Sequence, residues 1–369
     1  MRVALVHDWL LGMRGGEKVL EAIARMYPDA ELFTLIADRQ SLSPILQQRK
    51  IHTSWLQRLP GVRSYYRTLL PWMPGAIEQL DVTGFDLIIS SSHCVAKGVM
   101  VPSGAKHLCY CHSPMRYAWN LQELYISKVP APLRPIVRKQ LEKLREWDRK
   151  SSDRVHQFIA NGKTVQERIR SAYSRDSLII HPPVDTDFYH PDTERKREDY
   201  YLAVSALAPN KRIDLAVLAC MRQKKKLVII GSGQESKRLQ QMADPNLIQF
   251  LGWQSDEVIR EHYQRCKALL FPGEEDFGIV PLEANACGTA VIAYGHGGAT
   301  ETIQPLGEIE RPTGIWFNEA TVDSLCAAIE QFEQSGDAIE PKACRQNALH
   351  YRSERFTDTM QQAVKTFMS

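Results

Sequence analysis

The sequence contains no apolar stretch close to the ~20 residues that a transmembrane helix requires. Apolar residues make up 44% of its 369 residues and charged residues 24%, which is ordinary for a globular protein. The short apolar run within residues 1–8 is interrupted by polar residues too early for a signal peptide. We therefore expect a cytoplasmic protein that meets a membrane at most peripherally, at the inner face of the cell membrane.

The sequence also lacks a CxxC pair. Most of its cysteines lie within apolar runs, as buried thiols do in a reducing compartment. Cys109, Cys111 and His112 offer three possible ligands, but no second pair accompanies them, so we expect no zinc site and no bound metal. The eight cysteines are Cys94, Cys109, Cys111, Cys220, Cys266, Cys287, Cys326 and Cys344.

The formal net charge of +3 is too small to indicate nucleic-acid binding, and we expect no nucleic-acid partner. One segment is unbalanced, because no acidic residue occurs between Arg39 and Glu78. Basic residues there are interleaved with aromatic ones, which suits contact with an anionic membrane surface. A helix that packs its aromatic side chains inward explains the pattern equally well. The residues concerned are Arg49, Lys50, Arg58, Arg63 and Arg67, with Trp55, Tyr65, Tyr66 and Trp72.

A chain of this length favours two domains. Short apolar segments alternate with helical segments in both halves, which predicts an α/β protein with two parallel sheets. The segment 181–198 is rich in proline and charge and is the predicted linker. We place the first Rossmann-like domain at 1–190 and the second at 191–352, with a terminal helical segment at 353–369.

The predicted strands alternate with helices in both domains. In the first domain we predict strands at 3–7, 86–90, 107–111 and 155–160 and helices at 17–26, 134–151 and 163–172. In the second we predict strands at 200–205, 227–231, 248–252 and 268–271. Because ligands of such sheets bind at the carboxyl ends of the strands, we expect the two domains to face a central cleft.

Two carboxylates follow the predicted strand at 268–271. Glu275 lies in the loop after this strand, and Glu283 comes eight positions later, in the predicted first turn of a helix that starts at Pro281. The amides of residues 278–280 (Gly278, Ile279 and Val280) point out of such a helix start, which is a favourable place for an anion. The sequence therefore predicts a site for a sugar, a diphosphate and a ribose.

The spacing of Glu275 and Glu283 resembles the E-x7-E motif of retaining glycosyltransferases of family 4. The segments 284–292 (ANACGTAVI) and 297–301 (GGATE) are also similar to this family. The resemblance is strong from about residue 200 to 317. It implies a GT-B fold whose C-terminal helix crosses back to the first domain. It further implies that Glu275 holds sugar hydroxyls, that Glu283 holds the ribose, and that no metal or other cofactor is needed.

Two cations follow the first strand of the second domain. The resemblance implies that Lys211 contacts the donor diphosphate, whereas Ala206 stands where the family usually has an arginine. Arg212 is a possible replacement, or its side chain faces solvent. The donor-binding residues that we expect are Gly15, Gly16, Lys211, Arg212, Gly231, Glu275, Phe277, Gly278, Ile279, Val280 and Glu283.

The first domain offers a glycine pair and a histidine. Gly15-Gly16 opens a predicted helix and suits a phosphate, although a plain tight turn explains it equally well. His112 ends a predicted strand, where it either contacts an acceptor or sugar hydroxyl or bonds a nearby carbonyl. The run 109–119 (CYCHSPMRYAW) is similar to family members that build O-antigens and exopolysaccharides. We expect His112 and Arg116 to bind the acceptor, and Glu275, His112 and Lys211 to be catalytic.

The resemblance thus implies a retaining hexosyltransferase that uses a UDP- or GDP-linked glucose or mannose type of donor. Its acceptor is expected to be a glycan, carried on a lipid. Two alternatives stay open: a GT-B sugar-nucleotide epimerase, which needs no acceptor, and a non-catalytic protein that binds sugar nucleotides.

Overall fold

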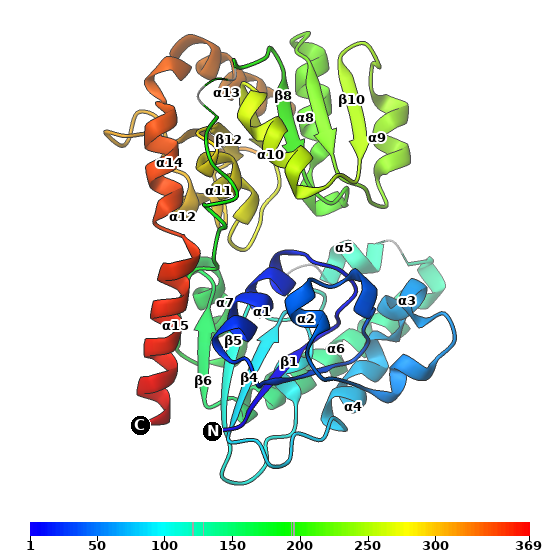
Figure 1. The fold of residues 1–369 in the computed structure, drawn as a ribbon. Helices are drawn as coiled ribbons and strands as arrows, with labels where there is room; N and C mark the ends of the chain where they lie inside the picture. Colours follow the sequence, from blue (N-terminus) through cyan, green and yellow to red (C-terminus); the bar gives the residue numbers. More distant parts are fainter. Residues whose placement is uncertain (120–121, 128, 193, 195) are drawn as a thin grey trace. The chain divides into compact units, whose positions relative to one another are not determined.

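The computed structural model describes residues 1–119, 122–127, 129–192, 194 and 196–369, so residues 193 and 195 of the predicted linker lie outside the described part. The chain forms two compact units, and the colours of Figure 1 follow the residue number along it. The first unit comprises Met1–Pro183 and Phe356–Ser369, and the second comprises Val184–Arg355. Residues 184–190, which we placed in the first domain, belong to the second unit, since the Val184 amide donates to the Tyr351 carbonyl at 2.8 Å.

The first unit contains a seven-stranded sheet with the order β3-β2-β1-β4-β5-β6-β7, and every pair of neighbours is parallel. The strands are β1 (Val3–His7), β2 (Glu31–Thr34), β3 (Ile51–Thr53), β4 (Leu87–Ser92), β5 (Lys106–Cys111), β6 (Gln157–Ala160) and β7 (Ser177–Ile179). Its helices are α1 (Gly15–Met26), α2 (Pro44–Gln47), α3 (Val62–Tyr65), α4 (Met73–Glu78), α5 (Gln122–Ser127), α6 (Arg134–Ser151) and α7 (Lys163–Tyr173).

Both faces of this sheet are buried. Successive side chains of a strand point to opposite faces, so Ala4 and Val6 of β1 join one apolar cluster while Val3 and Leu5 join another. The first cluster includes side chains of α4 and α6, and the second includes side chains of α1 and the C-terminal helix α15 (Ser353–Met368). This double cover explains why the strands read as continuous apolar runs.

Helix α15 begins in the second unit and continues into the first, where it lies beside β5 and β6 (Figure 1). Phe356, Met360 and Val364 are four residues apart and therefore form one buried stripe, which packs in the same cluster as β1. Near the helix end, Lys106 Nζ donates to the carbonyl oxygens of Phe367 and Met368, at 2.8 and 3.2 Å.

The second unit contains a six-stranded sheet with the order β10-β9-β8-β11-β12-β13, again with parallel neighbours. The strands are β8 (Tyr201–Val204), β9 (Leu227–Ile230), β10 (Ile248–Gly252), β11 (Ala268–Phe271), β12 (Ala290–Tyr294) and β13 (Gly314–Phe317). The helices are α8 (Ile213–Arg222), α9 (Ser236–Met242), α10 (Asp256–Arg265), α11 (Ile279–Ala286), α12 (Ala299–Thr302), α13 (Val322–Ser335) and α14 (Pro341–Leu349).

Helices cover both faces of the second sheet as well. Ala203 of β8 lies in a cluster with side chains of α8 and α13, whereas Leu202 lies in a cluster with side chains of α10 and α11. The order of the strands reverses between β8 and β11, which is where ligands of open parallel sheets bind, at the carboxyl ends of the strands. Within the described ranges, no helix is long and apolar enough to cross a bilayer.

We predict that Met360→Ala lowers the unfolding free energy of the first unit by about 2–5 kcal/mol, because a fully buried Met→Ala change leaves a cavity. The neighbouring side chain of Gln361 is exposed, so Gln361→Ala serves as the control and should change little. Urea-dependent hydrogen exchange of the β1 amides measures the effect. Equal losses in the two variants would show that α15 does not stabilise this sheet through its apolar stripe.

Candidate functional site

Lys211 and Glu275 meet at the carboxyl edge of the second sheet. Lys211 ends a 3₁₀ turn (Pro209–Lys211) that follows β8, and Glu275 lies in the loop after β11, the neighbouring strand. Lys211 Nζ lies 2.5 Å from Glu275 Oε1, and about a fifth of each side chain is exposed (21% and 23%). The structure thus brings together two residues that were predicted to bind the donor, as a charged pair open to solvent.

Three glycines lie so close to the backbone around this pair that none of them has room for a side chain. A Cβ at Gly273 would lie 2.8 Å from the Lys211 Cα, and one at Gly297 would lie 2.4 Å from the Glu275 carbonyl oxygen. A Cβ at Gly298 would lie 2.2 Å from the Phe277 Cα, and the Gly298 amide donates to the Glu275 carbonyl at 2.8 Å. The loop after β12 therefore fixes the position of Glu275 through its two adjacent glycines.

The helix that follows Glu275 starts earlier than the sequence predicts. Gly278 has a φ of +91°, which suits glycine, and α11 begins at Ile279. Pro281 is therefore the third helical residue, a position where its missing N–H removes no hydrogen bond within the helix. The prediction that Glu283 lies in the first turn is wrong: it is the fifth helical residue, in the second turn.

Glu283 is consequently more enclosed than Glu275. Only 8% of Glu283 is exposed, and the Tyr263 hydroxyl donates to its Oε2 at 3.3 Å. Burial and the nearby Glu283 carboxylate raise the pKa of Tyr263 well above its usual value, which keeps this hydroxyl protonated. Tyr263 thereby orients the Glu283 carboxylate from α10.

The structure also shows what surrounds three other residues that were predicted to bind the donor, namely Arg212, Gly231 and Phe277. Arg212 Nε donates to Asp214 Oδ1 at 3.3 Å, so its side chain is turned toward α8. A Cβ at Gly231 would lie 1.9 Å from the Ser205 carbonyl oxygen, so backbone packing alone requires this glycine. Phe277 is 3% exposed and its ring packs against Tyr351.

In the first unit, the carboxyl ends of β1, β4 and β5 bring a chain of polar side chains together. His7 Nδ1 lies 3.1 Å from Ser91 Oγ, and Ser91 Oγ lies 2.8 Å from His112 Nε2. His7 and Ser91 are buried, whereas His112 is partly exposed. Burial, with a contribution from the neighbouring His93, lowers the pKa of both His7 and His112 to about 3, so both imidazoles are neutral near pH 7.

Sequence reasoning missed the buried carboxylate beside these residues. Asp8 accepts hydrogen bonds from four consecutive amides, those of residues 93–96, at 2.5–3.1 Å. His93 Nδ1 also lies 3.0 Å from Asp8 Oδ2, and its side chain is 30% exposed. The available signal was that Asp8 comes directly after the predicted strand at 3–7, and polar side chains of a parallel sheet gather at such strand ends.

The predicted glycine pair lies against this histidine group. Gly15 and Gly16 are the first two residues of α1, so they belong to the helix rather than to a preceding loop. A Cβ at Gly16 would lie 3.6 Å from both His112 Nε2 and His7 Cε1, a normal contact distance. Arg116, partly exposed in the turn after β5, is four residues from His112 in sequence.

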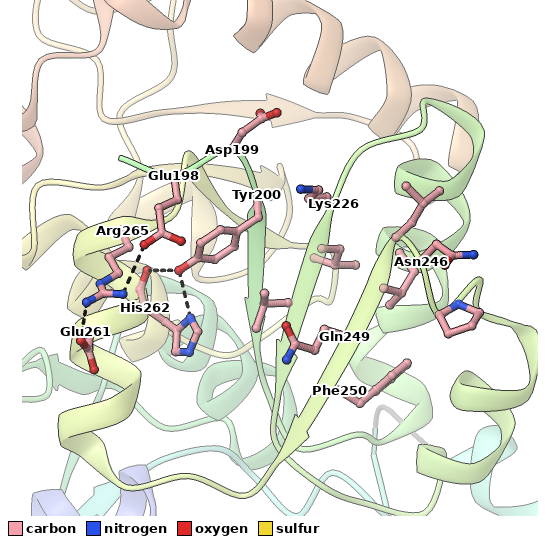
Figure 2. Close-up of a pocket in the computed structure, with 15 residues that line it drawn as sticks. Glu198, Asp199, Tyr200, Lys226, Asn246, Gln249, Phe250, Glu261, His262 and Arg265 are labelled. Carbon is pink, nitrogen blue, oxygen red and sulfur yellow. Dashed lines mark hydrogen bonds and ion pairs between the residues drawn. The ribbon is translucent and has the colours of Figure 1, made fainter. Parts of the chain in front are cut away.

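A groove of the second unit lies away from the predicted site residues. It has a volume of about 720 Å³ and is lined by residues at the amino ends of β8, β9 and β10. Figure 2 shows Arg265 between Glu198 and Glu261, and the Tyr200 hydroxyl beside His262 Nδ1 at 2.9 Å. None of the predicted site residues lines this groove, and Arg265 within it pairs with Glu198 and Glu261.

Residues 185–351 match the family model described as "Glycosyl transferases group 1". A GDP-mannose-dependent alpha-(1-6)-phosphatidylinositol monomannoside mannosyltransferase of Mycolicibacterium smegmatis is 29% identical over 194 residues, 45% of this chain and 50% of that protein. The O-antigen chain mannosyltransferase RfbU of Salmonella typhimurium is 29% identical over 205 residues, 51% of this chain and 54% of that protein. The chain thus spans about half the length of these curated relatives.

Solved structures share the fold over nearly the full length. Anabaena Alr3699/HepE in complex with UDP has a TM-score of 0.70 and 15% identity, covering 99% of this chain and 100% of that one. Sucrose-phosphate synthase from Thermosynechococcus elongatus has a TM-score of 0.76 and 17% identity, covering 100% and 99%. The expected GT-B fold is confirmed. Over residues 185–351, this chain is therefore similar to the glycosyl transferases group 1 family.

Proposed function

We propose that this protein is a retaining glycosyltransferase that transfers a hexose from a nucleotide-diphosphate sugar to a hydroxyl of a glycan. The observation that carries this proposal is the Lys211–Glu275 pair beside the start of α11, at the carboxyl edge of the second sheet. A cation, helix amides and a carboxylate at one edge match a ligand with an anionic and a hydroxylated part.

The diphosphate is assigned to the start of α11 and Lys211. The first amides of a helix lack partners within the helix and carry a partial positive charge, so they suit an anion. Gly278, with its positive φ, turns the chain so that Ile279 and Val280 open the helix. A fixed cation such as Lys211 stabilises the charge that grows on a departing diphosphate, which accelerates its departure.

The two carboxylates are assigned to different parts of the donor. Glu275, partly exposed and positioned by Gly297 and Gly298, would hold the hydroxyls of the hexose. Glu283, enclosed and oriented by Tyr263, would accept hydrogen bonds from the ribose. A carboxylate accepts such bonds more strongly than a neutral oxygen does.

An exposed tryptophan at the same edge suits the nucleobase. Trp253 directly follows β10 and is 77% exposed, and the neighbouring Gly252 carbonyl accepts from the Gly231 amide at 2.7 Å. Aromatic rings stack on bases regardless of base identity. The relatives named above include a GDP-mannose-dependent enzyme, so GDP-mannose is our first candidate donor and UDP-glucose our second.

Acceptor binding is assigned to the first unit, through His112 and Arg116. The names of the relatives include a phosphatidylinositol mannoside and an O-antigen chain, which supports a glycan acceptor carried on a lipid. For a retaining transfer, the bond from the anomeric carbon to the diphosphate breaks and the bond to the acceptor oxygen forms on the same face. The leaving phosphate then receives the proton of the acceptor hydroxyl.

Some side chains of the basic and aromatic segment of the first unit are buried in the core, and others are exposed on the surface. Leu56 is fully buried and Tyr66 is 6% exposed, whereas 62% of Trp72 is exposed. Trp55 and Tyr65 are more than one-third exposed at 38% and 37%. These exposed rings, with the exposed arginines of the same segment, support our proposal that it contacts an anionic membrane surface.

We predict that Arg58, Arg63 and Arg67 changed together to Gln weaken sedimentation with anionic vesicles at low salt. Basic residues near an anionic surface contribute about 1 kcal/mol each, and Arg63 should contribute least because it pairs with Asp38 at 2.9 Å.

The matched control changes three arginines of the second unit, Arg222, Arg238 and Arg352, to Gln. It removes the same net charge and should bind vesicles like the unmodified protein. Equal binding by both triple variants would refute the membrane proposal.

We also predict that transfer proceeds without a divalent metal, since helix amides and Lys211 are available for the diphosphate. Activity in excess EDTA should match the untreated rate. Loss of turnover in EDTA that added Mg²⁺ or Mn²⁺ restores would contradict this.

We predict that substitutions of Glu275 and Glu283 change different kinetic parameters of the transfer reaction. Glu275→Gln removes charge next to the reacting sugar, so kcat should fall by about 10²-fold or more. Glu283→Ala removes a contact far from the reacting carbon, so the donor KM should rise while kcat changes little. Steady-state kinetics with GDP-mannose or UDP-glucose and a glycan acceptor measure both.

Glu274→Gln is the matched control, because this neighbouring exposed acid undergoes the same change and should keep the normal kcat. Near-normal kcat in Glu275→Gln, or a loss confined to kcat in Glu283→Ala, would show that the roles are wrongly assigned.

A further inference from the structure

The His7–Ser91–His112 chain follows from strand register. His7 and Ser91 are direct partners in the β1–β4 pair, and Ser91 faces Tyr110 across the β4–β5 pair. Because side chains alternate between faces, His112 continues on the same side as Tyr110, two residues further on. The serine hydroxyl is thus placed between two imidazole nitrogens, at 3.1 and 2.8 Å.

Both rings are neutral near pH 7, so each carries one proton on its two nitrogens. Two tautomers for each ring give four combinations. One of them points a lone pair of both imidazoles at the serine, so its single proton meets only one of them, and buried His7 Nε2–H has no acceptor among the described residues. Three other arrangements remain. In the first, His7 Nδ1–H donates to Ser91, and the Ser91 hydroxyl donates to His112 Nε2. In the second, the direction is reversed. In the third, both imidazoles donate to the serine oxygen, and the buried hydroxyl proton has no acceptor.

A second observation selects among these arrangements. His7 Nε2 is buried and has no hydrogen-bond partner within the described residues. In the reversed arrangement this atom carries the proton, which leaves a buried N–H without an acceptor. In the first arrangement it is only a lone pair without a donor, and buried unpaired acceptors are tolerated better than unpaired N–H groups. In the third arrangement, the hydroxyl proton of fully buried Ser91 has no acceptor.

We propose that Ser91, with its direction set by His7, is a positioning residue that holds His112 as the Nδ1–H tautomer. Nε2 of His112 accepts from the serine, so the proton sits on Nδ1, which makes no hydrogen bond to the described residues. His112 is partly exposed, and this Nδ1–H is its group available to a ligand.

The ligand chemistry follows from the tautomer. A neutral Nδ1–H imidazole donates one hydrogen bond and offers no basic lone pair at that nitrogen. His112 would therefore bind an oxygen of a sugar hydroxyl or phosphate, and it would not take the proton of an acceptor hydroxyl. That His112 binds substrate rests on the proposed function, whereas its tautomer does not.

The chain supplies internal standards for both tautomers. His107 Nδ1 faces the Arg154 carbonyl at 3.0 Å, so it must donate, and Nε2 of His107 faces Ser90 Oγ at 2.8 Å. His156 Nδ1 accepts from the His107 amide at 2.9 Å, so His156 carries its proton on Nε2 when neutral.

Long-range proton–nitrogen NMR spectra of the full chain, labelled with ¹⁵N-histidine, test the proposal without any ligand. Near pH 7, His112 should show the Nδ1–H pattern of His107, with at least about a tenfold excess over the other tautomer. His112→Asn identifies the signals. A His112 spectrum with the Nε2–H pattern, or an even mixture, overturns the proposal.

Matched serine variants test the hydrogen bond itself. Ser91→Ala should shift the His112 Nε2 and His7 Nδ1 resonances, and Ser91→Thr, which keeps the hydroxyl, should restore them. Ser90→Ala should shift His107 and leave His112 unchanged, because Ser90 points to the other face. Retained reference signals of His156 report that each variant is folded. An unchanged His112 signal in folded Ser91→Ala contradicts the proposal.

Kinetics add a readout that depends on transfer activity. The Asn amide nitrogen replaces Nδ1 of histidine, whereas the Gln amide nitrogen replaces Nε2. His112→Asn should therefore keep a kcat/KM about 5- to 10-fold above that of His112→Gln, with GDP-mannose or UDP-glucose as donor. The reverse order contradicts a donating Nδ1–H. Absence of transfer by the unmodified protein would count against the proposed function alone, since the tautomer is measured separately.

Discussion

The ion pair between Lys211 and Glu275 joins two loops that come from neighbouring strands, β8 and β11. Such a pair forms only if both loops leave the same edge of the sheet and approach closely. Parallel strands satisfy the first condition, since all their carboxyl ends lie at one edge. Glycines satisfy the second, because Gly273 and Gly297 allow backbone contacts that a Cβ would block.

In the first unit, too, polar side chains meet because the carboxyl ends of parallel strands lie at one edge of the sheet. The carboxyl ends of β1, β4 and β5 bring His7, Ser91 and His112 within hydrogen-bonding distance. Buried Asp8 fixes the turn after β4 by accepting from four amides, and it also meets His93. Each unit thus presents oriented polar groups on a rigid frame, which lets these groups act without first being ordered.

Long, strongly patterned segments could be predicted from the sequence. Helix α6 has the predicted bounds, because its apolar positions repeat with helical spacing, and β1 and β11 are uniform apolar runs between breakers. The three- and four-residue strands β2, β3 and β7 were missed, since they are too short for periodicity to separate from loops. The start of α11 was misplaced because Pro281 was read as a first helical residue.

The candidate site was predictable where charge and motif coincide, as at Lys211 and Glu275. It was not predictable where distant segments meet. Asp8 contacts residues 93–96, more than 80 positions away, and no local pattern marks such a contact. The sequence also does not show that the Ser205 backbone requires a glycine at position 231. A glycine that packs against backbone and a glycine that contacts a ligand cannot be distinguished in a sequence.

The central claim is that the donor diphosphate binds at the carboxyl edge of the second sheet, where Lys211 meets Glu275. A crystal structure of the chain with bound GDP-mannose or UDP-glucose tests it most directly. The account predicts the diphosphate against the amides of Ile279 and Val280, with Lys211 Nζ moved from Glu275 to a phosphate oxygen. A nucleotide sugar in the groove lined by Tyr200 and Arg265, with the Lys211–Glu275 pair intact, would contradict it.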